Sequence, residues 1–322
     1  MKPIKVLIID DSSVIRAVIN EILKDDPDIE VVGEAKDPII AREQIKRLNP
    51  DVLTLDVEMP KMDGITFLKN LMRLRPMPVV MLSTLTTKGA DTTLEALEIG
   101  AIDFIAKPSF EELIENKSTF KETLLRKIKF AASINKQSHQ INSFATKSKN
   151  VNVHKFSGCR RSNHIVVIGA STGGTEAVKK IITTLPKNCP PILITIHIPA
   201  TFSARFAERI NGYTEANVQE ARHGQKIKEG NIYIAPGNMH LKVEAKSGTL
   251  YCLLEDSAEV NRHKPAVDVL FNSVTELASN VQAVLLTGMG QDGANGMLNL
   301  KKSGAMTIIQ DEASSLIWGM PG

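Results

Sequence analysis

Short apolar runs that alternate with longer amphipathic segments constrain the fold of this chain more than any other feature. In the first part of the chain the runs are Val6–Ile9, Val31–Val32, Val52–Leu55, Val79–Leu82 and Phe104–Ala106. Between the first two runs, apolar residues recur at helical spacing, as in an amphipathic helix. Strands that alternate with such helices form βαβ units around a parallel sheet. The sequence therefore predicts a doubly wound α/β domain that ends with a helix from about residue 110 to about residue 132.

The same alternation resumes at His164, after a segment of different composition. Residues 133–163 are rich in Ser, Asn and Lys and lack a sustained periodicity, which is typical of a linker. We therefore expect one domain over residues 1–128, a flexible linker over 129–163 and a second domain over 164–322. The second domain is expected to be a Rossmann-like parallel α/β domain. Its segment "NIYIAPGNMHLKVEAKSGTLYCLLED" has period-2 patches and two turn signals, which predict an inserted β-hairpin.

Charge and composition exclude several classes of protein. The net charge is +3, but residues 133–163 hold six basic residues and no acidic one, so the rest of the chain sums to −3. A nucleic-acid-binding domain carries its positive charge on a folded element, so nucleic-acid binding is not expected. The three cysteines lie far apart and do not form a disulfide framework. There is no signal-peptide pattern and no apolar run near the ~18 residues of a membrane span, so we expect a cytoplasmic protein without membrane insertion.

Polar residues end the predicted strands of the first domain. Asp10 and Asp11 follow the first strand, Asp56 ends the third, Ser83 ends the fourth and Lys107 follows the fifth. The carboxyl ends of parallel strands open at one edge of the sheet, where ligands bind. Three carboxylates there repel one another unless a hard cation lies between them, and Mg²⁺ prefers such oxygen ligands. A lysine and a hydroxyl nearby suit a phosphoryl group bonded to one carboxylate.

This joint pattern closely resembles the receiver domain of bacterial response regulators over roughly residues 1–125. The resemblance rests on the "DD" pair, on "DVEMPKMDG", on the Ser83 hydroxyl and on the "KP" pair at residues 107–108. It implies a flavodoxin-like fold in which Asp56 is phosphorylated by a histidine kinase. The roles that it implies for other residues are Mg²⁺ binding by Asp10, Asp11, Asp56 and the Glu58 carbonyl, phosphoryl contacts by Ser83 and Lys107, and a switch aromatic at Phe104.

A glycine-rich turn, "IGASTGG", follows the first strand of the second domain. It is either a loop that cradles a phosphate or a turn that exposes a nucleophile. A dinucleotide loop needs glycine where Ser171 stands, and a Walker loop needs a Gly-Lys-Ser/Thr sequence that is absent. Gly169-Ala-Ser171-Thr-Gly173 satisfies G-x-S-x-G, and N–H groups at a helix start can stabilise an oxyanion. Because small residues are common in strand-to-helix turns, this pattern alone is weak evidence for a nucleophile.

A serine nucleophile needs a base and an orienting acid. His197 ends the next predicted strand, and Asp292 follows a later strand in "TGMGQDGANG". In a parallel sheet these residues meet Ser171 at one edge, as a catalytic triad requires. Structural roles remain open for both, His197 as a buried strand-end histidine and Asp292 as a helix N-cap. The order Ser-His-Asp differs from that of α/β-hydrolases, so we do not predict that fold.

The second half resembles the catalytic domain of the CheB family of chemotaxis protein-glutamate methylesterases. The shared segments are "IGASTGG", "HIPATFSARFAERIN", "EGNIYIAPGNMHL", "NRHKPAVDVLF", "LLTGMGQDGANGM" and "IIQDEASSLIWGMP". The resemblance implies hydrolysis of glutamyl methyl esters on chemoreceptors, and in some members deamidation of glutamines, with no cofactor in this domain. It also implies that the receiver covers the active site until Asp56 is phosphorylated.

The same resemblance assigns roles to particular residues of the second half. It implies Ser171 as nucleophile, His197 as general base and acid, Asp292 as its orienting partner, and Thr172 with the Met289 backbone as the oxyanion hole. Family members continue past "GMP" into a further segment, so we expect this chain to be a truncated form.

Three alternative functions would require other sequence features or another outcome on mutation. A phosphorylation-controlled binding module would keep the fold without hydrolysis, which loss of activity in Ser171→Ala would exclude. A DNA-binding response regulator needs a helix-turn-helix and a basic recognition helix, and the sequence shows neither pattern. A nucleotide-dependent oxidoreductase is disfavoured by Ser171 within the glycine-rich turn.

Overall fold

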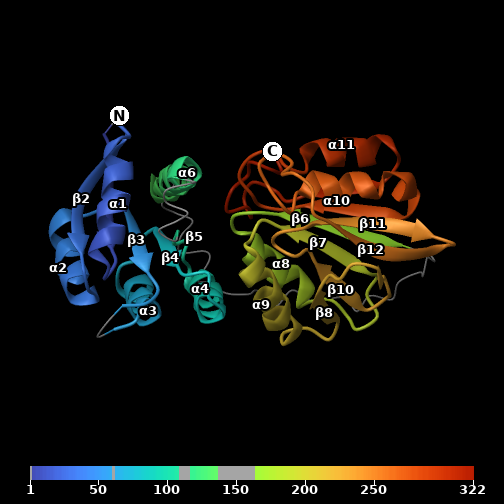
Figure 1. Cartoon of the computed structure of the whole chain (residues 1–322), viewed down its shortest axis with the longest axis horizontal. Helices are drawn as coiled ribbons and strands as arrows, with labels where there is room; N and C mark the ends of the chain where they lie inside the picture. The colour runs from blue at the N-terminus through green and yellow to red at the C-terminus, as the bar shows by residue number, and fades with distance from the viewer. Residues whose placement is uncertain (1, 60–61, 109–116, 137–163) are drawn as a thin grey trace. The chain divides into compact units, whose positions relative to one another are not determined.

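The computed structural model describes residues 2–59, 62–108, 117–136 and 164–322, which belong to two compact units (Figure 1). The strands of the first unit are β1 (Ile4–Ile9), β2 (Ile29–Ala35), β3 (Val52–Asp56), β4 (Val79–Ser83) and β5 (Asp103–Ala106). Its described helices are α1 (Ser13–Lys24), α2 (Pro38–Leu48), α3 (Gly64–Leu74), α4 (Thr87–Ile99) and α6 (Lys117–Lys136). The strands pair in parallel in the order β2-β1-β3-β4-β5. This is the order of flavodoxin-like proteins, so the predicted fold is confirmed.

Local sequence explains why the first elements begin where they do. The Ser12 hydroxyl accepts a hydrogen bond from the Ile15 N–H and caps α1, and the Asp37 carboxylate caps α2 in the same way. Residues 6–9 of β1 are fully buried, as expected for a strand covered by helices on both faces. The apolar run of residues 6–9 and the helical periodicity after Ser12 are local signals, which is why the sequence predicted β1 and α1.

The helix predicted from about residue 110 to about residue 132 corresponds to α6, whose C-terminal end lies further along the chain than predicted. The predicted residues 110–116 lie outside the described residues. Helix α6 runs from Lys117 to Lys136, because Ala131, Ala132 and Ile134 are buried. The predicted start of the linker, residue 129, therefore lies inside a helix. Residues 137–163, the remainder of the predicted linker, lie outside the described residues.

The second unit is built around a larger parallel sheet. Its strands are β6 (Ile165–Ala170), β7 (Ile192–Ile196), β8 (Asn217–Glu220), β9 (Gln225–Lys226), β10 (Asn231–Ile234), β11 (His240–Lys246), β12 (Thr249–Glu255), β13 (Val281–Leu285) and β14 (Met306–Ile309). Its helices are α8 (Gly174–Ile182), α9 (Ala200–Asn211), α10 (Val267–Ser273), the 3₁₀ helix η1 (Thr275–Asn280) and α11 (Ala294–Lys302). The order β14-β13-β6-β7-β10-β8 is parallel throughout. Figure 1 shows α8 and α9 on one face of this sheet and α10 and α11 on the other.

The predicted hairpin is present, but it is shorter than the segment that predicted it. Strands β11 and β12 pair antiparallel through the Ser247-Gly248 turn, where both residues have positive φ, and β12 also pairs with β9. The first part of the segment, β10, instead pairs in parallel with β7 and β8. Its residues Ile232–Ile234 are buried on both faces, so period-2 alternation was the wrong signal there.

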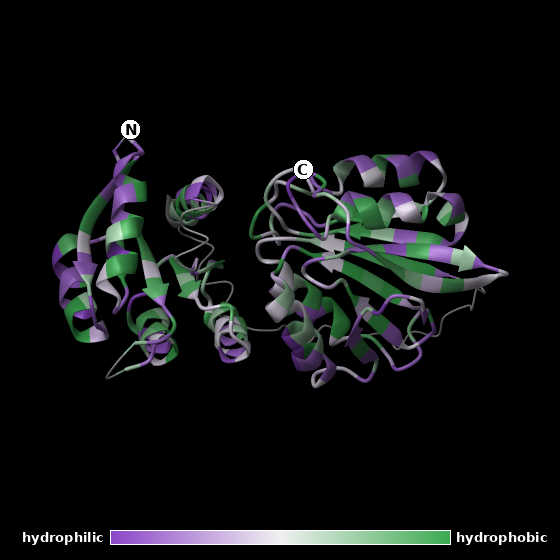
Figure 2. Cartoon of the chain, viewed as in Figure 1, coloured by the Kyte–Doolittle hydropathy of each residue, from purple (hydrophilic) through white to green (hydrophobic). Residues whose placement is uncertain are grey.

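Strands β13, β6 and β7 are neighbours in the centre of this sheet, and this order positions the site. Their carboxyl ends lead directly into the segments that hold Ser171, His197 and Asp292. Figure 2 shows apolar colour concentrated in the strands of both units, with both colours along the helices. Within the described part of the chain, no helix combines the length and the apolar character needed to cross a membrane.

Gly169, in β6, tests the packing of this edge. A Cβ at this position would lie 2.2 Å from Cγ1 of Val267, the first residue of α10. We expect Gly169→Ala to destabilise the second unit by about 1–3 kcal/mol, because α10 must move. Urea unfolding measures the change. Gly212→Ala is the control, because Gly212 has helical φ and meets only the Arg209 carbonyl at 3.4 Å, and equal destabilisation by both variants would contradict the packing argument.

Candidate active site and phosphoacceptor site

A cluster of carboxylates lies at the carboxyl edge of the first sheet. Asp10 and Asp56 are almost wholly buried, Asp11 is exposed, and the three offer ligand oxygens within 4.8 Å of one another. The Lys107 ammonium lies 2.8 Å from Oδ2 of both Asp10 and Asp56. The structure therefore brings together the predicted acidic residues and the predicted lysine.

The charge of this cluster fits a divalent cation. The cluster holds three carboxylates, and the Lys107 ammonium pairs with two of them, which leaves an excess of two negative charges when all are ionised. Burial and the neighbouring Asp10 charge raise the pKa of Asp56 to about 6, although Lys107 opposes the shift. The donors are all hard oxygens, the kind that Mg²⁺ and similar ions prefer. The residues present thus fit a divalent-metal site.

Other predicted residues of the first unit lie in or after strands β3, β4 and β5. The Glu58 N–H donates to Asp56 Oδ1 at 3.1 Å, so the loop after β3 is held against the carboxylate. The Ser83 hydroxyl lies 3.2 Å from the carbonyl oxygens of Thr84 and Gly89, either of which can accept its hydrogen. Phe104 is buried, and the Lys127 ammonium lies 5.3 Å from the centre of its ring. Ser83 would have to exchange its present partner to contact a phosphoryl group.

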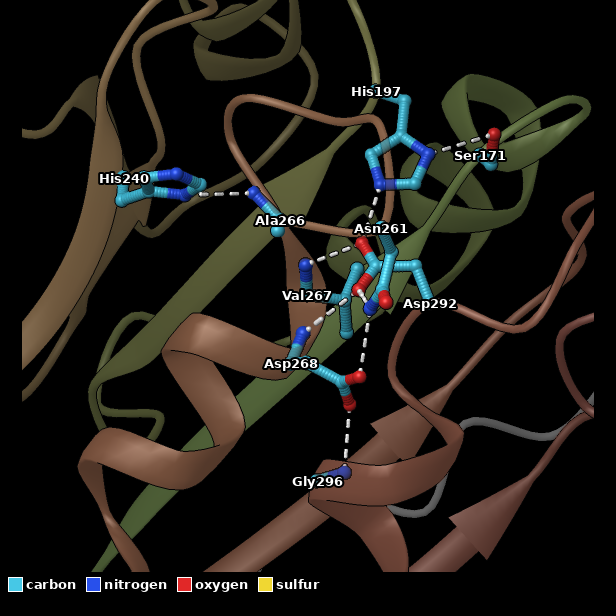
Figure 3. A network of polar contacts seen from close by, with 9 residues as sticks. All are labelled: Ser171, His197, His240, Asn261, Ala266, Val267, Asp268, Asp292 and Gly296. Atoms are coloured by element: carbon cyan, nitrogen blue, oxygen red, sulfur yellow. Dashed lines mark hydrogen bonds and ion pairs between the residues drawn. The ribbon is translucent and has the colours of Figure 1, made fainter. Parts of the chain in front are cut away.

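At the carboxyl edge of the second sheet, Ser171, His197 and Asp292 form a hydrogen-bonded chain (Figure 3). The Ser171 Oγ lies 3.1 Å from His197 Nδ1, and His197 Nε2 lies 2.8 Å from Asp292 Oδ2. The three residues follow β6, β7 and β13, which are adjacent strands. The predicted meeting of these side chains at one edge is therefore observed.

The hydrogen-bond partners of the two ring nitrogens of His197 determine where the imidazole proton lies. An ionised Asp292 can only accept a hydrogen bond, so Nε2 of a neutral His197 carries the proton. Nδ1 then has a lone pair directed at the Ser171 hydroxyl. In the chymotrypsin-type triad the two ring nitrogens have the opposite partners. Either nitrogen of imidazole can act as the base, so the chemistry does not depend on this difference.

Asp292 is only 2% exposed, and it stays ionised because donors surround it. Its Oδ2 accepts from His197 and from the Val267 N–H at 2.7 Å, and its Oδ1 accepts from Asn261 Nδ2 at 2.9 Å and from the Asp268 N–H at 3.1 Å. Burial acts to raise the pKa of Asp292, but the hydrogen bonds and the nearby histidine lower it to about 2. The carboxylate is thus negative throughout the neutral pH range.

The turn around Ser171 leaves little space for side chains. The Ser171 N–H donates to the Thr287 carbonyl at 3.0 Å, and the Gly174 N–H donates to the Ser171 carbonyl at 2.7 Å, just where α8 begins. Gly173 has φ of +78°, and a Cβ on Gly288 would lie 2.8 Å from the Ser171 Cβ. These glycines allow two loops to approach the serine closely. Thr172 and Met289, the predicted oxyanion residues, follow Ser171 and Gly288 on these loops.

The site also contains residues to which the sequence analysis assigned no role. The His263 ring stacks on His197 with 3.6 Å between ring centres and 14° between planes. Thr287 is buried, and its hydroxyl accepts from the Ile317 N–H at 2.8 Å, so the C-terminal segment is attached to the Ser171 turn. Asn261 and His263 lie in the shared segment "NRHKPAVDVLF", which was the only signal that pointed to them.

Comparison with known proteins places both units in one family. A CheB methylesterase family model matches residues 166–322, and a response regulator receiver domain model matches residues 6–117. A protein-glutamate methylesterase/protein-glutamine glutaminase of Hydrogenovibrio crunogenus is 48% identical, with 100% of this chain and 93% of the relative covered. A similarly named protein of Saccharophagus degradans is 50% identical, with 100% and 92% covered. The solved CheB methylesterase catalytic domain of Thermotoga maritima is 40% identical, covers 50% of this chain and 86% of that one, and has a TM-score of 0.49.

The raised pKa of Asp56 has a measurable consequence for stability. An acid whose pKa is higher in the folded state stabilises the fold below its unfolded pKa near 4, and this stabilisation is lost as the pH rises through about 6. We expect Asp56→Asn to raise the free energy of unfolding by on the order of 1–3 kcal/mol at pH 8 in a chelator, because it removes a buried charge. The gain should vanish at pH 4. Urea unfolding of the first unit at both pH values measures it.

Asp63→Asn is the matched control for this prediction. Asp63 is an exposed N-cap of α3, a position that asparagine fills equally well. A gain for Asp56→Asn that is the same at pH 4 and pH 8 would contradict the electrostatic explanation.

Proposed function

The chain belongs to the CheB family of protein-glutamate methylesterases, and on that premise we propose that it hydrolyses glutamyl methyl esters of chemoreceptors through Ser171, His197 and Asp292. The observation that carries this proposal is the hydrogen-bonded chain from the Ser171 hydroxyl through His197 to the buried Asp292 carboxylate. A serine without such a base is a poor nucleophile at neutral pH. The names of the relatives also include a glutaminase activity, and the same site suits that reaction.

The proposed reaction follows from the geometry. Ser171 Oγ attacks the ester carbonyl carbon while His197 Nδ1 takes the hydroxyl proton, and the negative Asp292 stabilises the imidazolium that forms. The imidazolium then gives its proton to the leaving methoxide, so methanol departs and an acyl-serine remains. Water attacks this ester with His197 again as base, which releases the glutamate and regenerates Ser171. With a glutamine substrate the leaving group is ammonia.

The developing oxyanion needs hydrogen-bond donors. The Ser171 N–H already donates to the Thr287 carbonyl, so we assign the donors to the backbone of Thr172 and Met289 on the adjacent loops. Donors that are already fixed in place cost no reorganisation when charge develops, and loss of one typically slows such reactions by about 10²–10³-fold.

We further propose that the first unit controls this activity by phosphorylation of Asp56, with a histidine kinase as phosphodonor. Asp10, Asp11, Asp56 and the Glu58 carbonyl would hold Mg²⁺, which neutralises carboxylate and phosphoryl charge when it is bound. The Lys107 ammonium already lies beside Asp56 and would pair with the phosphoryl group. Ser83 would donate to a phosphoryl oxygen, and Phe104 would change position with the modification.

Ser171→Ala tests the nucleophile. We expect methanol release from methylated receptor to fall on the order of 10³–10⁶-fold in kcat, as in other serine hydrolases. Ser303→Ala, at the exposed end of α11, is the matched control and should keep the wild-type rate. Undiminished turnover in a folded Ser171→Ala protein would exclude this serine as the nucleophile.

Acetyl phosphate with Mg²⁺ tests the control by phosphorylation. We expect it to raise the rate of the wild-type protein, because a small phosphodonor can modify Asp56 directly. Asp56→Ala should keep a basal rate and lose the response. A response of equal size in the variant would place the modified residue elsewhere.

A further inference from the structure

A tight turn at residues 260–263 brings the side chains of Asn261 and His263 into contact with Asp292 and His197. Val260 and His263 exchange backbone hydrogen bonds of 3.1 and 3.0 Å across this turn. Its central residues, Asn261 and Arg262, have φ of 55° and 65°, the left-handed region that such turns require. Asparagine tolerates this region better than most residues other than glycine, so the turn geometry accounts for the backbone of Asn261. The role of this turn in the site therefore follows from the contacts of the Asn261 and His263 side chains.

The Asn261 amide lies between two aspartates (Figure 3). Its Nδ2 donates to Asp292 Oδ1 at 2.9 Å and to Asp268 Oδ2 at 2.8 Å. A side-chain amide has two N–H hydrogens, so each carboxylate receives one. Asn261 therefore links the triad acid to a second carboxylate that the proposed mechanism does not use.

Asp268 is itself firmly held. It is 4% exposed, and its Oδ1 accepts from the Gly296 N–H of α11 at 2.6 Å. Its own N–H donates to Asp292 Oδ1. Asp268 thus ties the Asn261 amide to α10 and α11, two helices of the protein core.

The consequence is that the Asp292 carboxylate has a single orientation. Each of its oxygens accepts from two donors, and loss of Asn261 would leave Oδ1 with the Asp268 N–H alone. The far end of the same turn carries His263, whose ring stacks on His197. One short turn therefore contacts both the acid and the base of the triad.

We infer that Asn261 is a positioning residue for ester hydrolysis, which holds Asp292 Oδ2 toward His197 by linking Asp292 to the buried Asp268. This inference rests on the proposed function. A misplacement of about 1 Å in such a group can cost about 10²-fold in rate. Residue 261 must donate a hydrogen bond to Asp268 and another to Asp292. An asparagine amide can do so, whereas an aspartate carboxylate of the same shape cannot.

The experiment compares Asn261→Ala and Asn261→Asp with the wild-type full chain. We expect kcat on methylated receptor to fall about 10- to 100-fold in Asn261→Ala, with KM within about threefold. Asn261→Asp should lose more, because it keeps the shape and places a third carboxylate beside two others. Asn217→Ala is the matched control, because the Asn217 amide bonds to Asn231 in the distant strands β8 and β10.

The pH profile separates positioning from a role in folding alone. Ser171, Asp292 and the His263 ring face His197. With fewer donors on Asp292, more of its negative charge acts on His197, so the acidic limb of kcat/KM should move to higher pH in both variants. A variant that is only less stable would lose Tm and keep both kcat per folded molecule and the profile, and that result would overturn the inference.

A measurement without turnover keeps this test separate from the proposed function. Carbon-13 NMR of the Asp292 carboxyl should show its pKa rising above the wild-type value in Asn261→Ala, because a donor to the carboxylate is lost. If the wild-type protein releases no methanol, the proposed function fails. The titration of the Asp292 carboxyl still shows whether Asn261 donates a hydrogen bond to it. If the wild type is active and Asn261→Ala matches it in kcat, pH profile and carboxyl titration, the inference alone is wrong.

Discussion

The buried negative charge of Asp292 determines how the catalytic unit is built around it. An ionised carboxylate away from water is costly unless every oxygen is paired. Its donors come from the end of β7, from the start of α10 and from the turn at residues 260–263. The segment after β7, the turn at residues 260–263 and the start of α10 therefore meet at one carboxylate. The pKa of about 2 shows that this pairing more than compensates for burial.

The carboxylate cluster of Asp10, Asp11 and Asp56 in the first unit shows the opposite electrostatic balance. There too a parallel sheet gathers carboxylates at its edge, but Lys107 pairs with only two of the three, Asp10 and Asp56. The pairing does not compensate for burial, and the pKa of Asp56 rises to about 6. The cluster around Asp56 lacks positive charge and is therefore suited to binding a cation. The Asp292 carboxylate has a donor for each lone pair that it uses and is therefore suited to keeping a fixed orientation. The two units thus use similar folds for different purposes.

The serine turn depends on chain segments that are distant in sequence. Thr287 accepts from Ser171 through its carbonyl and from Ile317, in the C-terminal segment, through its hydroxyl. Gly288 pairs with Trp318 as an isolated bridge, and a Cβ on Gly288 would lie 2.1 Å from the Met320 sulfur. The C-terminal segment therefore packs against the two residues, Thr287 and Gly288, that contact Ser171. Substitutions in this segment should therefore shift the position of Ser171.

The sequence by itself determined the parallel sheets and the residues at their edges. Apolar runs and helical periodicity follow from burial along the local chain, and parallel strands place their carboxyl ends together, so Asp10, Asp56, Ser171, His197 and Asp292 could be predicted. The tertiary structure alone decided that Asn261 binds Asp292, that His263 lies on His197, and that His197 faces Ser171 through Nδ1. It also decided that β10 joins the parallel sheet and that α6 continues past residue 129. Turns and element ends have no periodicity, and their positions follow from packing between segments far apart in the chain.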